Sequence, residues 1–138
     1  MNPDHYIGEQ VTYFEEPDII VLKLRGEVSE EEGIELNRRN REFGKGLGHV
    51  FFLIDLEHMT NLPPKVRKVA TETLNEVPTR GVAIYRAPFK ARVIAKLIIT
   101  ALNMFRREAA KDPVEFTDSE EEARAWIAKR RKEILGAN

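Results

Sequence analysis

The chain has 138 residues, of which 42% are hydrophobic and 33% are charged, and its formal net charge is −1. This length and composition predict one globular domain over residues 10–135, preceded by a short N-terminal extension over residues 1–9. A net charge close to zero disfavours nucleic-acid binding, because that function gains affinity from an excess of bases. The absence of cysteine excludes disulfide bonds, thiol catalysis and cysteine-ligated metals.

The N-terminal residues do not contain the basic segment followed by an apolar segment that a secretory signal peptide needs. The chain also contains no run of about 18 apolar residues that could cross a membrane. We therefore expect a cytoplasmic protein.

Two strands joined by a turn are the first predicted elements. Residues 10–15 alternate loosely between polar and apolar side chains, and residues 19–24 are apolar except for Lys23. A turn with Pro17 at its centre joins them, and Gly26 is predicted to end the second strand. The short connection predicts an antiparallel hairpin.

A helix and a buried strand are predicted after the hairpin. Ser29 and Glu32 have the spacing of a capping box, which predicts a helix over residues 29–43. Residues 50–54 are apolar at every position, which is typical of a central strand covered on both faces. This strand ends at Asp55.

The remaining elements alternate between helix and strand. They are a loop over residues 56–62, a helix over 64–77, a strand over 81–85, a long helix over 88–108, a strand over 113–117 and a last helix over 120–135. The order is thus β-β-α-β-α-β-α-β-α. It predicts an α/β fold with four helices and a mixed sheet of about five strands, mostly parallel at its centre.

This order resembles the STAS domain, and within it the SpoIIAA-like branch of bacterial proteins, which is grouped with lipid-binding CRAL-TRIO domains. Three features carry the resemblance: the apolar strand 51–55 that ends in Asp55, the strand 81–85 before a long helix, and the strand 113–117 followed by acids and Trp126. The resemblance covers residues 11–132. It implies a non-enzymatic regulatory module of the anti-sigma factor antagonist type, which docks a protein partner.

The resemblance also implies where the partner binds. Phosphorylation-controlled members carry Asp-Ser and then Gly at the start of the helix after the central strand, and the phosphate disrupts docking of a kinase. This chain has no serine there, and Ser29 and Ser119 are predicted to be helix caps. Thr60 is the hydroxyl closest to that position and is a candidate phosphorylation site. We expect a partner to bind residues 56–77, and the predicted partner-binding residues are Asp55, His58, Thr60, Asn61, Lys65 and Lys68.

Asp55, Glu57 and His58 form the one predicted cluster with both acids and an imidazole. If strand alternation persists, Asp55 and Glu57 point one way and His58 points the other. We favour the interpretation that Asp55 accepts backbone N–H groups, while Glu57 and His58 are solvated. For Thr60 and Asn61 we favour capping of the next helix over contact with a ligand.

We expect neither catalysis nor a cofactor. His5, His49 and His58 lack the spacing of metal ligands, and the chain lacks a glycine-rich loop after a strand that could bind phosphate. The basic run near the C-terminus follows Glu120, Glu121 and Glu122, an order that complements the helix dipole. We therefore interpret the run as part of a solvated helix rather than as a nucleic-acid site.

The helix over residues 88–108 is more apolar than one covering a sheet needs to be. Lys96, Thr100, Asn103 and Arg107 fall within one arc of about 60°, and apolar side chains occupy most of the remainder, so the apolar surface of the helix is roughly twice as wide as a single packed side requires. The excess could be covered by the helix 29–43 or the C-terminal helix, by a second copy of the chain, or by a lipid or other apolar ligand. Arg86, Lys90, Arg92 and Lys96 would supply positive charge for a lipid surface. The residues predicted for a homodimer or lipid surface are Val93, Ile94, Leu97, Ile98, Ile99, Leu102 and Phe105.

Overall fold

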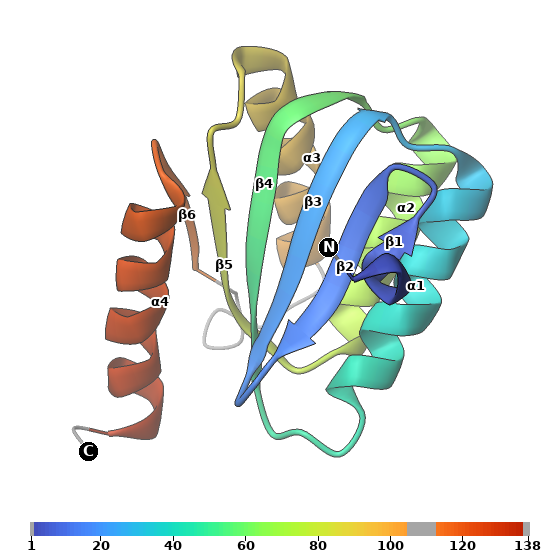
Figure 1. The fold of residues 1–138 in the computed structure, drawn as a ribbon. Coiled ribbons are helices and arrows are strands. Elements are labelled where there is room, and N and C mark those ends of the chain that lie inside the picture. The colour runs from blue at the N-terminus through green and yellow to red at the C-terminus, as the bar shows by residue number, and fades with distance from the viewer. Residues whose placement is uncertain (1, 105–112, 137–138) are drawn as a thin grey trace.

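The computed structural model describes residues 2–104 and 113–136 (Figure 1). Its strands form one six-stranded sheet, in which the spatial order β1-β2-β3-β4-β5-β6 follows the sequence. The strands are β1 (Tyr6–Ile7), β2 (Gln10–Glu15), β3 (Ile19–Glu27), β4 (Val50–Asn61), β5 (Thr79–Tyr85) and β6 (Val114–Thr117). The helices are a 3-10 turn η1 (Pro3–His5), α1 (Glu30–Gly44), α2 (Pro64–Glu76), α3 (Phe89–Met104) and α4 (Glu120–Leu135).

The sheet is mixed, as predicted. β1, β2 and β3 pair antiparallel, and β3 through β6 pair parallel. The helices α1, α2 and α3 connect successive parallel strands and all lie on one face of the sheet, while α4 lies on the opposite face (Figure 1). Connections between parallel strands have the same hand, and here the strands follow one another in sequential order. Their connecting helices therefore lie on the same side of the sheet.

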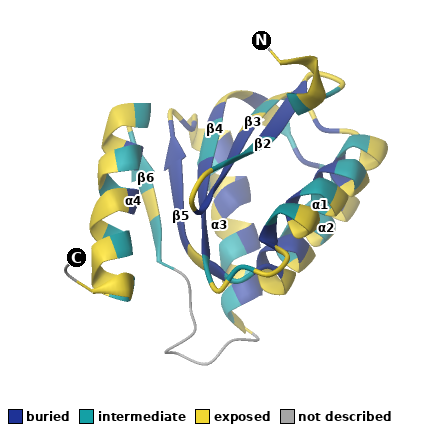
Figure 2. Cartoon of the chain, turned by 60° about the horizontal axis from the view of Figure 1, so that its bottom comes forward, coloured by how far each residue is buried: buried dark blue, intermediate teal, exposed yellow. Residues whose placement is uncertain are grey.

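Both faces of the central strands are buried, which confirms the prediction made from their continuous apolar character (Figure 2). In β4, Phe52 belongs to the core under α1–α3, and its neighbours Phe51 and Leu53 belong to the core under α4. In β5, Ile84 belongs to the core under α1–α3 and Ala83 to the core under α4. Alternate side chains of one strand therefore fill two separate cores.

Several predicted elements are confirmed. The hairpin joins β2 to β3, and the capping box is present at the start of α1, where Ser29 Oγ accepts from Glu32 N at 3.1 Å and Glu32 Oε1 accepts from Ser29 N at 2.9 Å. Ser119 caps α4 by accepting from Glu122 N. The predicted end of the helix at residues 105–108 lies outside the described residues.

Several strand boundaries differ from the prediction. Residues 6–7, expected in the N-terminal extension, form the edge strand β1 beside β2. The predicted loop 56–62 is wrong, because β4 continues to Asn61. β3 also continues past Gly26, which has a φ of 64°, and supplies a parallel partner for the end of β4.

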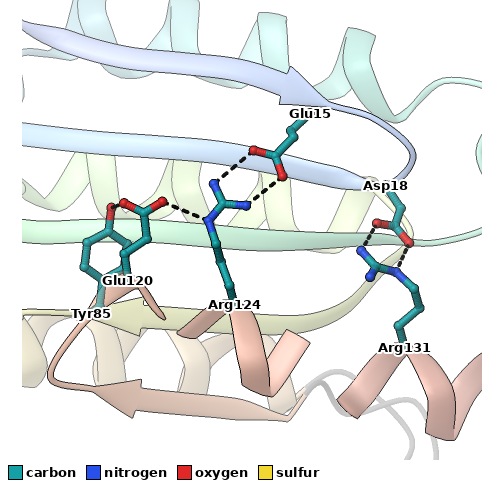
Figure 3. Close-up of polar contacts among 6 residues, drawn as sticks. All are labelled: Glu15, Asp18, Tyr85, Glu120, Arg124 and Arg131. Carbon is teal, nitrogen blue, oxygen red and sulfur yellow. Dashed lines mark hydrogen bonds and ion pairs between the residues drawn. The ribbon is translucent and has the colours of Figure 1, made fainter. Parts of the chain in front are cut away.

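The C-terminal helix is solvated at Lys129 and Lys132, as its charge pattern predicts, but two of its arginines bind acids of the β2–β3 hairpin. Arg124 donates two hydrogen bonds to Glu15 at 2.7 and 2.9 Å, and Arg131 donates two to Asp18 at 2.6 and 2.9 Å (Figure 3). Glu15 and Asp18 belong to the β2–β3 hairpin, whose turn is far from α4 in the sequence. Two forked ion pairs therefore fasten α4 across the sheet.

Asp18 is the more deeply buried of the two acids, with a side chain 2% exposed. Burial alone would raise the pKa of Asp18, but hydrogen bonds from Arg131 and His49 hold this pKa below its ordinary value. His49 Nε2 lies 2.9 Å from Asp18 Oδ2. The carboxylate is thus charged, buried and fully partnered in the folded state.

We expect Asp18→Asn to lower the free energy of unfolding by about 2 kcal/mol, because it removes a charge that accepts three hydrogen bonds. Urea unfolding followed by circular dichroism measures this change. Arg38→Gln is the control, because it breaks an ion pair with Glu35 on the exposed side of α1 and should leave the unfolding midpoint unchanged. Equal midpoints for parent and Asp18→Asn would contradict the anchoring role.

The effect of Asp18 should also depend on pH. A carboxylate whose pKa is lower in the folded than in the unfolded state stabilises the fold above its unfolded pKa, which is about 3.9. This stabilisation is lost as pH falls through the folded pKa. The difference in unfolding free energy between parent and Asp18→Asn should therefore shrink between about pH 5 and pH 2. A difference that is constant over this range would show that the charge of Asp18 is not what stabilises α4.

Candidate functional site

The candidate site is the end of β4 together with the start of α2. β4 pairs with β5 only as far as Asp55, and beyond this residue β4 continues beside β3 alone. The register between Asp55 and Asn61 shifts twice, so β4 contains extra residues relative to β3. As a result Leu56, Met59 and Leu62, spaced by three, all point into the core under α1–α3.

These register shifts change which side chains face outward. Strand alternation predicts that Glu57 and His58 point in opposite directions, but both are exposed, and His58 Nε2 lies 3.6 Å from Glu57 Oε1. Asp55 Oδ1 accepts from the backbone N–H of Glu57 at 2.9 Å, as the preferred interpretation predicts. Asp55 is in register with Lys23 and Tyr85, which places it on the face that α4 covers. The contacts of Asp55 and His58 thus do not form an acid–base pair.

The capping role predicted for Thr60 and Asn61 is wrong. Pro63 is the N-cap residue of α2 and makes no side-chain hydrogen bond, while Pro64 occupies the first helical turn. Asn61 Nδ2 instead donates to Glu27 Oε1 at 3.1 Å, because the pairing of β3 with β4 brings these two residues together. Thr60 is exposed, so its hydroxyl is accessible from solvent.

The first turns of α2 carry bases and no acid. Lys65 and Lys68 are exposed, and Arg67 is half-buried. Lys65 Nζ lies 3.4 Å from Glu30 of α1. Because the N-terminus of a helix already carries a partial positive charge, bases at this end add to a positive potential rather than cancelling it. The start of α2 is therefore suited to a negatively charged group.

The connection from β5 to α3 lies beside this surface. Arg86 has a φ of 55°, in the left-handed region that non-glycine residues rarely adopt. Its backbone N–H donates to Thr117 O at 3.1 Å, and its guanidinium lies 3.8 Å from Glu57 Oε1. Arg86 thereby links the end of β5 to the outward side of β4.

Comparisons with known proteins agree with this architecture. No family model matches the chain, and no curated protein matches it. Among solved structures, the anti-sigma factor antagonist SpoIIAA in its unphosphorylated form superposes with a TM-score of 0.60, over 86% of this chain and 97% of the other. The two sequences are 11% identical, so the likeness concerns the fold. The chain has the STAS fold. This confirms the fold predicted from the order of elements.

Within the STAS fold, the structure shows a polar chain that the sequence analysis missed (Figure 3). The Tyr85 hydroxyl donates to Glu120 Oε1 at 3.3 Å, and Glu120 Oε2 accepts from Arg124 Nε at 2.8 Å. Burial, followed by the negative charges of Asp55 and Glu120, raises the pKa of Tyr85. The spacing of seven residues between Arg124 and Arg131, which puts both on one side of α4, is the sequence signal that could have indicated these anchors.

A cavity of about 120 Å³ lies between the sheet and α1–α3. Its lining is almost entirely apolar, and its polar members are Asn37, Asn40 and Thr73. Asn40 accepts from Thr12 at 2.6 Å, and Thr73 donates to Asn37, so these groups are engaged with neighbours. The cavity therefore contributes space in the core rather than reactive groups.

The homodimer or lipid surface predicted on α3 is corrected in part. Ile94, Ile98 and Leu102 are buried in the core, and Ile99 is half-buried. α3 packs mainly beside α2, a neighbour that was not among the covers considered from the sequence. Val93 and Leu97 remain exposed. Phe105 lies outside the described residues.

No group of three or more His, Asp or Glu side chains within residues 2–104 and 113–136 is arranged to hold a metal ion. In the same part of the chain, no helix has the length and apolar character that crossing a membrane requires.

We expect Asn61→Ala to change the free energy of unfolding by less than about 0.5 kcal/mol, because its side chain makes one exposed hydrogen bond and does not cap α2. Ser29→Ala is the matched comparison and should cost about 1 kcal/mol, because it removes a true N-cap. Chemical unfolding of the two variants tests this difference. A cost for Asn61→Ala equal to that of Ser29→Ala would restore the capping role.

Proposed function

We propose that this protein is a non-enzymatic regulatory module that binds a protein partner through the end of β4 and the first turns of α2. We call this region the β4–α2 surface and define it by His58, Thr60, Asn61, Lys65 and Lys68. The protein with the same fold is named an anti-sigma factor antagonist, which acts on another protein. The resemblance noted in the sequence implies docking at the same point of the fold, which supports the proposal.

The observation that carries the proposal is that buried residues of β4 and of its connection to α2 hold the β4–α2 surface outward. Leu56, Met59 and Leu62 are buried, and their packing holds the intervening polar side chains outward. Asp55 faces the α4 side of the sheet, so we leave it out of the docking surface. Functional groups held by buried neighbours keep a fixed geometry, which lowers the entropy cost of binding.

The charge of the β4–α2 surface indicates the chemistry of the partner. Lys65 and Lys68 project from the positive end of α2, and no acid lies in its first turn. An acidic surface on the partner would complement this charge. Phosphorylation of Thr60 would add nearly two negative charges next to these bases and would oppose such a partner.

The alternatives expected from the sequence, homodimerisation and lipid binding, concern a different part of the molecule. With Ile94, Ile98 and Leu102 buried, both alternatives depend on the outward side of α3. The β4–α2 surface does not require either of them.

Charge reversal tests the proposal. Immobilised parent protein should retain a defined partner from native lysate of the source organism, and Lys65→Glu with Lys68→Glu should abolish this retention. Lys129→Glu with Lys132→Glu, on exposed positions of α4, is a control with the same change in net charge and should retain the partner. Bound proteins are identified by mass spectrometry. An unchanged set of bound proteins for the α2 variant would contradict the proposal.

Thr60→Glu gives a second result from the same experiment. It places one negative charge on the β4–α2 surface, and it should weaken binding of an acidic partner about tenfold, because like charges are then juxtaposed. Thr60→Gln is the uncharged control of similar size. Equal weakening by both substitutions would show that the shape of the surface matters and its charge does not.

A further inference from the structure

The outward side of α3 carries apolar side chains that no described part of the chain covers. Phe89 is 82% exposed, Val93 42% and Leu97 53%. Their spacing of four residues places them one after another along the same side of the helix. Met104, 74% exposed, lies seven residues beyond Leu97 and continues the row. We call these four residues the α3 stripe.

The α3 stripe lies away from the side of the helix that packs in the core. The core side is formed by Ala91, Ile94, Ala95, Ile98 and Leu102, all of which are buried. α3 therefore carries a second row of apolar side chains, within which Thr100 is the one exposed polar residue, and the fold buries only the core side. A single core-facing side needs an apolar arc of only about 100°. A second apolar side indicates contact with something outside the chain.

The charged residues of α3 itself and of the segment that leads into it are all positive within residues 86–104. The segment from Arg86 to Met104 contains four bases and no Asp or Glu. At about 100° per residue, Lys96 and Lys90 fall on opposite borders of the stripe. Lys96 Nζ lies 5.7 Å from the centre of the Phe116 ring, and the Arg92 guanidinium lies 5.7 Å from the same ring, which holds both bases along one border.

We infer that α3 binds an anionic lipid surface, with the α3 stripe among the head groups and upper acyl chains and the bases at the level of the lipid phosphates. Phenylalanine and leucine on one side of a helix, with lysine and arginine at its borders, are what binding in the plane of a membrane interface requires. The inference goes beyond the proposed partner docking and does not depend on it, because lipid binding needs no protein partner.

A second copy of the chain is the competing occupant, and the charge pattern disfavours it. In a two-fold contact centred on Val93 and Leu97, Lys96 of one copy would approach Lys96 of the other, because this base borders the centre of the stripe. Such like-charge contacts oppose association. Anionic lipid head groups would instead neutralise Lys90, Lys96 and their neighbours at once.

Co-sedimentation with vesicles tests the inference. The full chain is mixed with phosphatidylcholine vesicles that contain roughly 30% phosphatidylserine, and with vesicles of phosphatidylcholine alone. We expect binding to the first and little to the second. Lys90→Gln with Lys96→Gln should weaken binding about 25-fold, since each base near an anionic membrane contributes about a factor of five. Lys129→Gln with Lys132→Gln, on α4, has the same net charge and should bind like the parent.

A second variant tests the apolar part. Phe89→Ala with Leu97→Ala changes exposed side chains, so the fold should persist, which circular dichroism checks. This variant should lose most vesicle binding although its charge is unchanged. Absence of parent binding to either vesicle would overturn the inference, as would equal losses for the α3 and α4 charge variants. A dimer in light scattering that Phe89→Ala with Leu97→Ala converts to monomer, without vesicle binding, would assign the α3 stripe to self-association and would also overturn it.

Discussion

The parallel pairing of β3 with β4 is the constraint on which the rest of the structure depends. It joins the antiparallel hairpin to the parallel half of the sheet, and it continues beyond the point where β5 ends its pairing with β4. The extra residues in the end of β4 keep Leu56 and Met59 on the buried side. Without this continued pairing, the polar residues from Glu57 to Asn61 would have no fixed direction. The candidate docking surface is thus a consequence of sheet register and not of a specialised loop.

The opposite face of the sheet is stabilised by a different set of interactions. Within the part of the chain that the structure describes, α4 is the one helix that covers this face, and its buried residues are Ala123 and Ile127. The close approach of α4 to β5 offsets this small buried apolar surface. A Cβ atom at Gly81 would lie 3.2 Å from the Trp126 ring, so the glycine leaves the space that the indole ring needs. Forked ion pairs at both ends of the contact then fix the helix along the sheet (Figure 3). Of the two acids, Asp18 is buried and Glu15 is partly exposed, and each carboxylate oxygen has a donor, which fixes the orientation of the pair.

The fold class could be predicted because its signals are local. Strands that are apolar at every position indicate burial on both faces, and the Ser29 capping box marks a helix start within four residues. The end of β4 could not be predicted in this way. Its residues, which include Asp55, Glu57, Thr60 and Asn61, have the composition of a loop, and they form a strand because β3 provides a partner that no local pattern reveals.

The anchors of α4 show the same limit for charged residues. Arg124 and Arg131 bind acids that are 109 and 113 residues away in the sequence. No local pattern shows these partners, and the acids close by on the same helix led to the prediction that the bases are solvated. For α3, the excess of apolar surface was visible in the sequence. Its division into a buried side and an exposed stripe depended on packing beside α2, which the sequence analysis did not assign.

The two proposed surfaces begin at the same end of the molecule. α2 and α3 each follow the C-terminal end of a parallel strand, they pack side by side, and Arg86 and Glu57 connect the two strand ends at 3.8 Å (Figure 1). A partner on the first turns of α2 would therefore lie close to any membrane that contacts Phe89. Binding of one ligand must then change the affinity for the other, favourably if the partner also touches lipid and unfavourably if it collides with the membrane. By linkage, each ligand changes the affinity for the other by the same factor. The sign of this coupling can be measured as the partner affinity with and without anionic vesicles. A higher affinity with vesicles would indicate recruitment of the partner to a membrane, and a lower affinity would indicate competition between the two ligands for one end of the fold.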